Sequence, residues 1–203
     1  MNVTLQNLEL LVDAFNSLPG IGKKMATKLA CHILECDKKM VDIFAARLKT
    51  AKEKIGKCKY CNNYTEFQLV CTICSDENRS KKKICIVTNY LDLVSIENCL
   101  SWTGIYYVLG KEITPNSKID SNELDLSKLL KLLSNGGEEV LISTDLTPRG
   151  VLTADYLYQI IKKYQPDTKI FRIGFGMPVN SSINYADEMT LKYAFDNKQE
   201  YKK

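Results

Sequence analysis

Residues 58–74 read CKYCNNYTEFQLVCTIC, which places cysteines in the pattern C-x2-C-x9-C-x2-C. Thiolates are soft metal ligands, and two C-x2-C pairs on a short loop can direct four sulfurs to one tetrahedral Zn²⁺. Separate core cysteines and disulfides are the alternatives, but the neighbouring residues are polar and disulfides belong to oxidising compartments. The pattern therefore predicts one structural zinc ion per chain, bound by Cys58, Cys61, Cys71 and Cys74. Four thiolates would close the coordination sphere and leave no position for a substrate.

On the N-terminal side of the cysteines, apolar residues recur at helical spacing in three segments. They predict helices from Leu5 to Phe15, from Ala26 to Leu34 and from Val41 to Ile55. Gly56 follows the third segment at the position where a C-cap glycine would end a helix.

The turn between the first two helices is rich in glycine and reads LPGIGKK over residues 18–24. Two glycines one residue apart allow backbone N–H groups to point outwards together, and the next helix adds the positive end of its dipole. An ordinary helix–helix turn is the alternative, since such turns often contain Pro and Gly. With its lysines, the turn is similar to the helix-hairpin-helix motif of proteins that bind DNA without reading its sequence. It predicts backbone-phosphate contacts from Gly20, Gly22, Lys23, Lys24 and Lys28.

Charge is distributed unevenly along the 203 residues, whose formal net charge is +4. Residues 1–83 contain 15 Lys or Arg against 9 Asp or Glu, whereas residues 84–203 contain 13 against 15. A basic N-terminal part suits a polyanionic partner such as nucleic acid, although solvated lysines are common on helices.

Composition predicts a cytoplasmic protein that does not enter a membrane. No apolar run approaches the roughly 20 residues of a membrane span, and the N-terminus lacks the basic and apolar segments of a signal peptide. The remaining cysteines lie within helical or strand patterns and are expected to be reduced core thiols: Cys31, Cys36, Cys85 and Cys99. His32, which lies beside apolar residues of a helix, is expected to be packed rather than catalytic.

After residue 83, short apolar strands alternate with helices. The expected strands are Ile84–Val87, Ile105–Leu109, Glu139–Ser143 and Lys169–Ile173. The expected helices lie near Leu91–Leu100, Leu124–Leu133 and Thr153–Tyr164. This alternation indicates an α/β sheet with parallel strands and crossover helices.

The order of these parts resembles the RecR family of bacterial recombination-repair proteins. Residues 18–22 (LPGIG) and 29–32 (LACH) fit the family's N-terminal signature, and the cysteines fit its zinc finger. Residues 84–87 (ICIV), 104–110 (GIYYVLG) and 146–150 (LTPRG) are similar to segments of its Toprim (topoisomerase–primase) domain. Residues 172–179 and 185–191 are close to its C-terminal block.

This resemblance implies a multidomain α+β protein. Its expected parts are a helical helix-hairpin-helix domain (1–56), a four-cysteine zinc finger (57–75), a charged linker (76–83), an α/β Toprim domain with a largely parallel sheet (84–178) and a C-terminal segment with a helix (179–203). It also implies a DNA-binding protein that acts with RecO and RecF to load recombinase at gapped DNA, and a ring-like homotetramer.

The Toprim segment departs from the pattern of Toprim enzymes, which hold Mg²⁺ with acidic residues after two strands. Thr88 stands at the first of these positions, and Arg149 and Val151 stand in the later segment. The remaining acidic residues could be ordinary surface or capping groups, or the remnant of a metal site: Asp92, Glu97 and Asp145. Tyr107 stands where the family usually has histidine.

A non-enzymatic protein is therefore expected, and Mg²⁺ is not expected as a cofactor. The sequence also contains no G-x-x-x-x-G-K-[ST] phosphate loop and no recognisable pair of nucleophile and base. A Mg²⁺-dependent Toprim nuclease or primase is the alternative. An adaptor that binds only protein is a third hypothesis, but it would leave the glycine turn and the basic N-terminal part unexplained.

Overall fold

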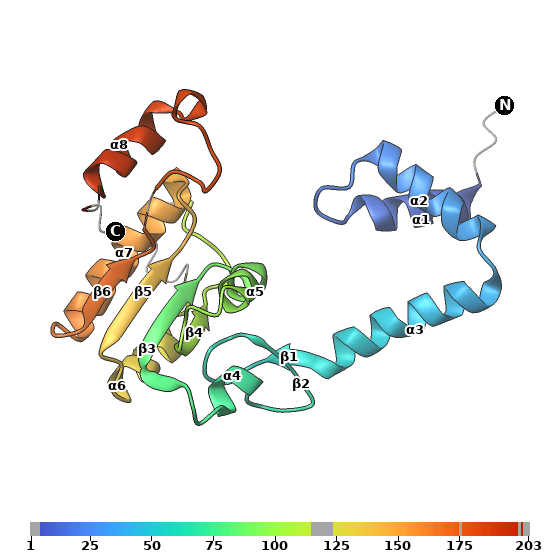
Figure 1. Cartoon of the computed structure of the whole chain (residues 1–203). Coiled ribbons are helices and arrows are strands. Elements are labelled where there is room, and N and C mark those ends of the chain that lie inside the picture. The colour runs from blue at the N-terminus through green and yellow to red at the C-terminus, as the bar shows by residue number, and fades with distance from the viewer. Residues whose placement is uncertain (1–4, 115–123, 175, 199, 201–203) are drawn as a thin grey trace. The chain divides into compact units, whose positions relative to one another are not determined.

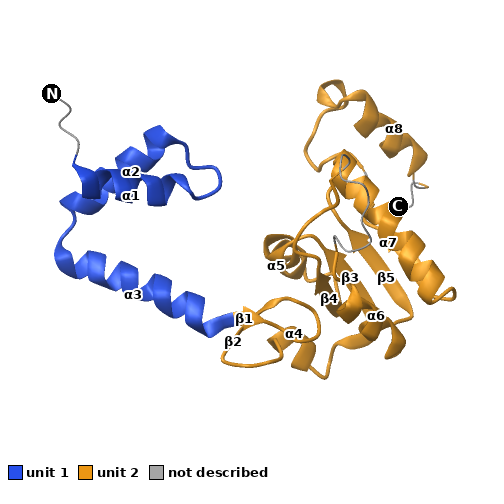
Figure 2. Ribbon diagram, turned by 180° about the vertical axis from the view of Figure 1, so that it is seen from behind, with its two compact units in different colours: residues 1–55 blue, residues 56–203 orange. Residues whose placement is uncertain are grey.

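The computed structural model describes residues 5–114, 124–174, 176–198 and 200. The chain forms two compact units, Met1–Ile55 and Gly56–Lys203 (Figure 2). Phe175 and residues 201–203, which belong to the expected C-terminal block and segment, lie outside the described residues. Over the described ranges, no helix is long and apolar enough to cross a membrane.

The first unit contains helices α1 (Gln6–Asn16), α2 (Lys23–Glu35) and α3 (Lys38–Lys54). Helices α1 and α2 pack around Val12, Ala26 and Ala30. Alanine at both positions of α2 leaves little side-chain bulk at the contact, so the two helix backbones can approach closely. The side chain of Asp37 caps α3 by accepting a hydrogen bond from the Met40 N–H at 2.9 Å. No residue of α3 is buried.

The expected C-cap role of Gly56 is wrong. Ile55 is the C-cap of α3, and its φ of −94° belongs to extended backbone. Gly56 is the middle residue of strand β1 (Ile55–Lys57) and does not have a positive φ. The chain leaves α3 directly into a strand, so it never takes the left-handed conformation for which a C-cap glycine is needed.

Residues 57–75 form the cysteine loop at the start of the second unit. Strand β1 pairs with β2 (Tyr64–Glu66), and the short helix α4 (Thr72–Ser75) follows. The four cysteines lie at the centre of this loop, and three of them are buried.

The main sheet contains β3 (Ser80–Val87), β4 (Gly104–Val108), β5 (Glu139–Ser143) and β6 (Lys169–Arg172). Its strands run in the order β4-β3-β5-β6 and all pairs are parallel (Figure 1). The expected largely parallel α/β sheet is thereby confirmed. Ile84 pairs with Ile105 on one side and with Val140 on the other, which sets the register of the central strands.

Helices cover both faces of this sheet. They are α5 (Tyr90–Asn98), α6 (Ser127–Ser134) and α7 (Pro148–Tyr164). Because successive strand residues point to opposite faces, β3 presents Ile84 and Ile86 to the core with α6 and α7, and Cys85 and Val87 to the core with α5. Burial on both faces explains why β3 ends as a continuous apolar run.

Two boundaries differ from those expected. Strand β3 begins at Ser80, so the second half of the expected linker 76–83 belongs to the sheet. The Ser80 N–H donates to the Thr103 carbonyl at 3.0 Å and the Glu138 N–H donates to the Lys82 carbonyl at 2.8 Å. Backbone pairing continues there although the side chains are charged, so an apolar pattern does not reveal it.

Helix α7 begins at Pro148, five residues before its expected start. Thr147 caps it by accepting a hydrogen bond from the Gly150 N–H at 3.2 Å, and proline occupies the first turn, where a missing N–H costs nothing. The C-terminal part contains a 3-10 turn (Ile183–Tyr185) and helix α8 (Glu188–Asp196), and neither contains a buried residue.

Candidate metal centre and nucleic-acid interface

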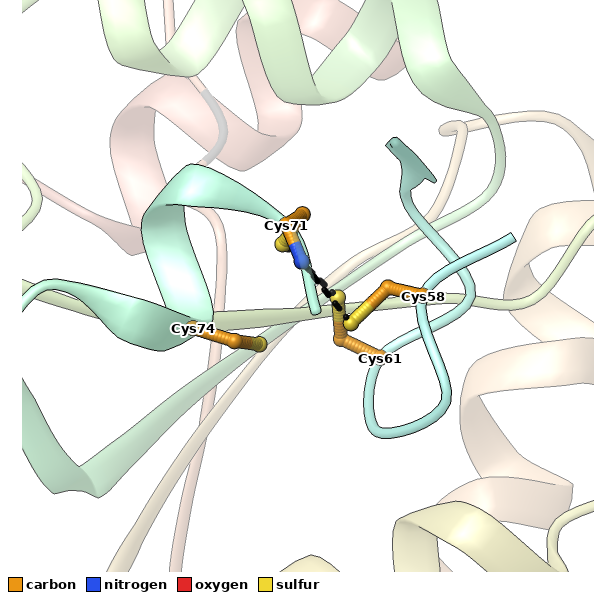
Figure 3. Close-up of side chains that lie close together, drawn as sticks. All are labelled: Cys58, Cys61, Cys71 and Cys74. Atoms are coloured by element: carbon orange, nitrogen blue, oxygen red, sulfur yellow. Dashed lines mark hydrogen bonds between the residues drawn. The ribbon is translucent and has the colours of Figure 1, made fainter. Parts of the chain in front are cut away.

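The sulfurs of Cys58, Cys61, Cys71 and Cys74 lie within 4.8 Å of one another (Figure 3). Tetrahedral zinc with Zn–S distances of about 2.3 Å needs sulfurs about 3.8 Å apart. All eight cysteines of the chain are free thiols. The two C-x2-C pairs therefore converge on one point, as a four-thiolate metal site requires.

Backbone hydrogen bonds hold the loop around the thiols. The Cys58 N–H donates to the Asn63 carbonyl at 2.7 Å, and the Lys59 N–H donates to the Leu69 carbonyl at 2.9 Å. The Cys71 N–H donates to the Cys58 sulfur at 3.4 Å (Figure 3). An N–H directed at a ligand sulfur stabilises its negative charge and orients it.

Without a cation, the thiols must share protons. Cys61 and Cys71 approach with their sulfurs 3.5 Å apart. Hydrogen bonding to Cys71, followed by that to Cys74 and by burial, raises the pKa of Cys61, while hydrogen bonding from Cys61 lowers the pKa of Cys71. Four adjacent thiolates would repel one another, and a divalent cation removes that conflict. The donor set thus fits a structural metal site with soft ligands.

The cysteine loop is joined to the sheet by residues that sequence reasoning missed. The Val108 N–H on the edge strand β4 donates to the Cys61 carbonyl at 2.8 Å. Lys128 of α6 donates to Asn62 Oδ1 at 2.7 Å and to the Cys58 carbonyl at 3.3 Å. In the sequence, the asparagine at position 62 was the available signal, because asparagine tolerates the left-handed region of a tight turn. The structure gives Asn62 a φ of 61°.

Tyr107 completes this attachment. Its hydroxyl donates to the Asp125 carbonyl at 2.8 Å and accepts from Asn62 Nδ2 at 3.4 Å. Burial raises the pKa of Tyr107 to about 12, so the hydroxyl keeps its proton at neutral pH and remains a donor. Tyr107 thus links the β4 core to the cysteine loop.

In the first unit, the glycine turn is built by Gly20. The Ile21 N–H donates to the Leu18 carbonyl at 3.2 Å, and Gly20 has a φ of +80°, which favours glycine. Gly22 is the N-cap of α2, and no side chain caps this helix. The first N–H groups of α2 consequently have no side-chain acceptor.

All three expected lysines lie near this helix start. Lys23, Lys24 and Lys28 line a surface hollow of about 400 Å³ together with Gly22 and Met25. Gly20 lies in the turn just before it. Uncapped N–H groups, the helix dipole and nearby cations are what a phosphate group requires. DNA contact by these residues stays a prediction.

The carboxyl edge of the sheet is the edge at which the parallel strands end, and it carries Thr88, Glu112, Asp145 and Arg149. There the side-chain carboxylate of Glu112 is already hydrogen-bonded within the protein. Glu112 Oε1 accepts hydrogen bonds from the Thr88 hydroxyl at 3.3 Å and from the Asp145 N–H at 3.2 Å. Arg149 donates to the Thr114 hydroxyl at 3.3 Å. Glu112 follows β4 rather than the two strands that carry acids in Toprim enzymes, so the family pattern did not single it out.

The other acidic candidates have local structural partners. Asp92 forms a capping box with Asn89 at the start of α5. Glu97 pairs through both carboxylate oxygens with Arg79, one of these contacts being 2.9 Å. Asp92 and Glu97 therefore lie on the same helix, α5, but bond to different partners, and Asp145 lies apart from them, after β5.

The expected burial of His32, Cys31 and Cys99 is wrong, because all three residues are exposed. Cys36 is half-buried, and only Cys85 of the four remaining cysteines is buried. His32 lies about 200° around α2 from the buried Ala30, since an α-helix turns about 100° per residue. Its Nε2 is 3.7 Å from the Cys36 sulfur.

Comparisons with known proteins follow the same order of parts. Residues 8–52 match the family "RecR, helix-hairpin-helix", residues 82–174 match the Toprim domain, and residues 176–199 match "RecR, C-terminal". The chain is thus a helix-hairpin-helix protein with a Toprim domain. Its C-terminal match points, within that class, to RecR.

Proteins named recombination protein RecR align over nearly the whole chain. That of Ureaplasma urealyticum is 40% identical over 192 residues, which cover 94% of each chain. That of Natranaerobius thermophilus is 36% identical over 191 residues with the same coverage. That of Xanthomonas axonopodis is 35% identical over 194 residues, covering 95% of this chain and 97% of the relative. The chain belongs to the RecR family.

Proposed function

We propose that this chain is a non-enzymatic DNA-binding protein of recombination repair, which acts with RecO and RecF to load recombinase at gapped DNA. The observation that carries DNA binding is the start of α2, which no side chain caps and where Lys23, Lys24 and Lys28 line a surface hollow. Membership of the RecR family supports the recombination role, and the partners are proposed on the same ground.

Zinc is the proposed metal of the cysteine loop. Four thiolates with no other donor suit Zn²⁺ better than Mg²⁺ or Ca²⁺, which prefer oxygen ligands. Because such a site is closed, its role is to fold the loop rather than to activate water.

Mg²⁺-dependent catalysis is disfavoured by the carboxyl edge. Phosphoryl transfer with bound metal needs clustered carboxylates, but Asp92 and Glu97 are engaged elsewhere and Arg149 adds a permanent positive charge. Among the residues that the structure describes, the rival nuclease or primase would be left with Glu112 and Asp145 at this edge. Nicking that requires Mg²⁺ and disappears in an Asp145→Ala variant would establish the rival.

Self-association is the proposed source of the assembly, a tetrameric ring. Helix α3 has no buried residue, and its Phe44 and Leu48 are 44% and 59% exposed. Large apolar side chains are also exposed on the C-terminal part, including Val179, Tyr185 and Phe195. Exposed apolar faces of this kind support contacts with further copies of the chain. Light scattering should give the mass of four chains, and Leu48→Glu should lower it.

The DNA contact can be tested by reversing charge at the helix start. The double variant Lys23→Glu/Lys24→Glu should weaken binding to all sequences alike and reduce the log–log salt slope by about 0.7 to 0.9 for each lost phosphate contact. Lys38→Glu/Lys39→Glu is the matched control, because it makes the same charge change at the start of α3, which Asp37 already caps. If both double variants weaken DNA binding equally, the lysines of the glycine turn contribute only general electrostatic attraction and not a specific phosphate contact.

A substitution at Gly22 tests close approach of the backbone. Its φ is −80° and a Cβ would meet nothing within 4 Å, so Gly22→Ala should fold normally. The added methyl group would nevertheless stand between the helix N–H groups and a phosphate oxygen. Unchanged DNA affinity in a titration of Gly22→Ala would contradict the proposed contact.

A further inference from the structure

Two tyrosines from distant parts of the second unit meet on its surface. Tyr64 of β2 and Tyr90, the first residue of α5, have ring centroids 5.3 Å apart and an interplanar angle of 61°, an edge-to-face pair. Tyr64 is 51% exposed and Tyr90 is 41% exposed. In an edge-to-face pair only one ring face is covered by the partner ring. The pair therefore keeps aromatic surface open to solvent.

A cation lies at the same end of the sheet. The amino group of Lys57 would be 3.9 Å from a Cβ built on Gly110, and the Gly110 N–H donates to the Thr88 carbonyl at 2.8 Å. Thr88 lies two residues before Tyr90, so Lys57 and the tyrosine pair share the carboxyl ends of β3 and β4. Lys111, the residue after Gly110, is also exposed. Glu66, two residues after Tyr64 on β2, is exposed and carries the opposite charge.

Attachment of the cysteine loop does not depend on the tyrosines. The Cys61 carbonyl is bonded to β4 and Asn62 is bonded to Lys128, and both contacts lie on the loop segment before Tyr64. A purely structural role would also not require rings that are about half exposed.

We propose that Tyr64 and Tyr90, with Lys57, form a binding site for the unpaired bases of single-stranded nucleic acid, separate from the glycine turn. Bases of any sequence stack on aromatic rings, and lysines beside such rings attract the backbone. The bases of a duplex hide their faces in the stack, so this site distinguishes a single strand from a duplex without reading sequence. The inference rests on the proposed DNA binding and adds the part of the strand that is recognised.

The test uses the full chain, with an oligodeoxythymidine, an abasic strand of equal length and a duplex of equal length. Tyr64→Leu and Tyr90→Leu should each weaken binding of the oligodeoxythymidine by roughly 5- to 100-fold, the usual range for one lost base stack. Binding of the abasic strand and the duplex should stay unchanged. The salt slope should also stay unchanged, because no phosphate contact is lost.

Three further variants separate stacking from folding. Tyr64→Phe keeps the ring and should keep the affinity. Tyr158→Leu is the matched control, because Tyr158 is also 51% exposed but lies on α7. Lys57→Gln should weaken both single strands and reduce the salt slope by about 0.7. Metal content should be measured for every variant, and Tyr90→Leu remains informative if Tyr64→Leu disturbs the loop.

Two results would overturn the proposal: unchanged oligodeoxythymidine affinity in both leucine variants, or equal losses for all three ligands. The experiment also distinguishes which proposal is wrong, DNA binding at the glycine turn or base stacking at the tyrosines. The Lys23→Glu/Lys24→Glu variant should weaken all three ligands and lower the salt slope, whereas the tyrosine variants should affect only the strand that has unpaired bases.

Discussion

The second unit carries possible cation ligands in two regions, the cysteine loop and the carboxyl edge of the sheet. In the loop, four thiols face one another within 4.8 Å. At the edge, Glu112 bonds to Thr88 and to the Asp145 backbone, while Asp92 caps a helix. Ligand residues of the right type are present in both places, but only the loop makes them converge. Convergence, rather than the number of acidic or thiol groups, separates a metal site from a surface with ordinary structural bonds.

The largest effect should come from breaking the convergent region. Cys71→Ser should release the metal and unfold the loop, because structural zinc couples roughly 10–16 kcal/mol of binding to folding. Elemental analysis and thermal unfolding would measure both consequences, with Cys99→Ser as the control for loss of an exposed thiol. Metal-sufficient, reduced protein that contains no zinc would end the zinc proposal.

An intermediate effect should follow from loosening the loop's attachment. Lys128→Met removes the hydrogen bonds to Asn62 and to the Cys58 carbonyl, and it also removes a positive charge beside the thiolates. Outer contacts of this type typically change metal affinity by about 10- to 100-fold. Zinc release to a colorimetric chelator should accelerate accordingly. Lys131→Met, on the exposed side of α6, should release zinc at the parent rate; equal rates for all three proteins would contradict the role of Lys128.

The smallest effect should come from adding a ligand to the edge. Thr88→Glu would place a second carboxylate next to Glu112, at an expected cost of about 1 kcal/mol, or about 2–4 °C in Tm for a chain of this size. Millimolar Mg²⁺ should restore part of that loss and should leave the parent protein unaffected. Thr88→Gln controls for size without charge. If Mg²⁺ already stabilises the parent protein, the acidic residues at this edge form a metal site without the added glutamate.

Sequence was sufficient for the features that depend on local spacing. The cysteine pattern predicted which four residues would meet, and the apolar alternation after residue 83 predicted the parallel sheet. The glycine turn also identified the α2 start at which Lys23, Lys24 and Lys28 gather. These features could be predicted because each is announced by a short local pattern: the cysteine spacing, the apolar strand and helix segments, and the glycine turn.

Features that depend on contacts between distant residues could not be predicted. Lys128 is 66 residues from Asn62, and Glu112 is 24 residues from Thr88. The charged start of β3 is a strand only because neighbouring strands supply its backbone partners. Similarly, His32 lies in an apolar stretch, but its exposure depends on which side of α2 faces α1.

The bond from the Val108 N–H to the Cys61 carbonyl has one further consequence. Strand β4 lies at the border of the sheet, where unpaired backbone groups can recruit a strand from another molecule. The cysteine loop pairs with one of these groups, the Val108 N–H, and so covers part of the exposed edge of the sheet. If a bound metal holds the loop in place, its loss would also free this N–H group and open part of the β4 edge to pairing with another chain. Metal retention and resistance to aggregation would then depend on the same contact.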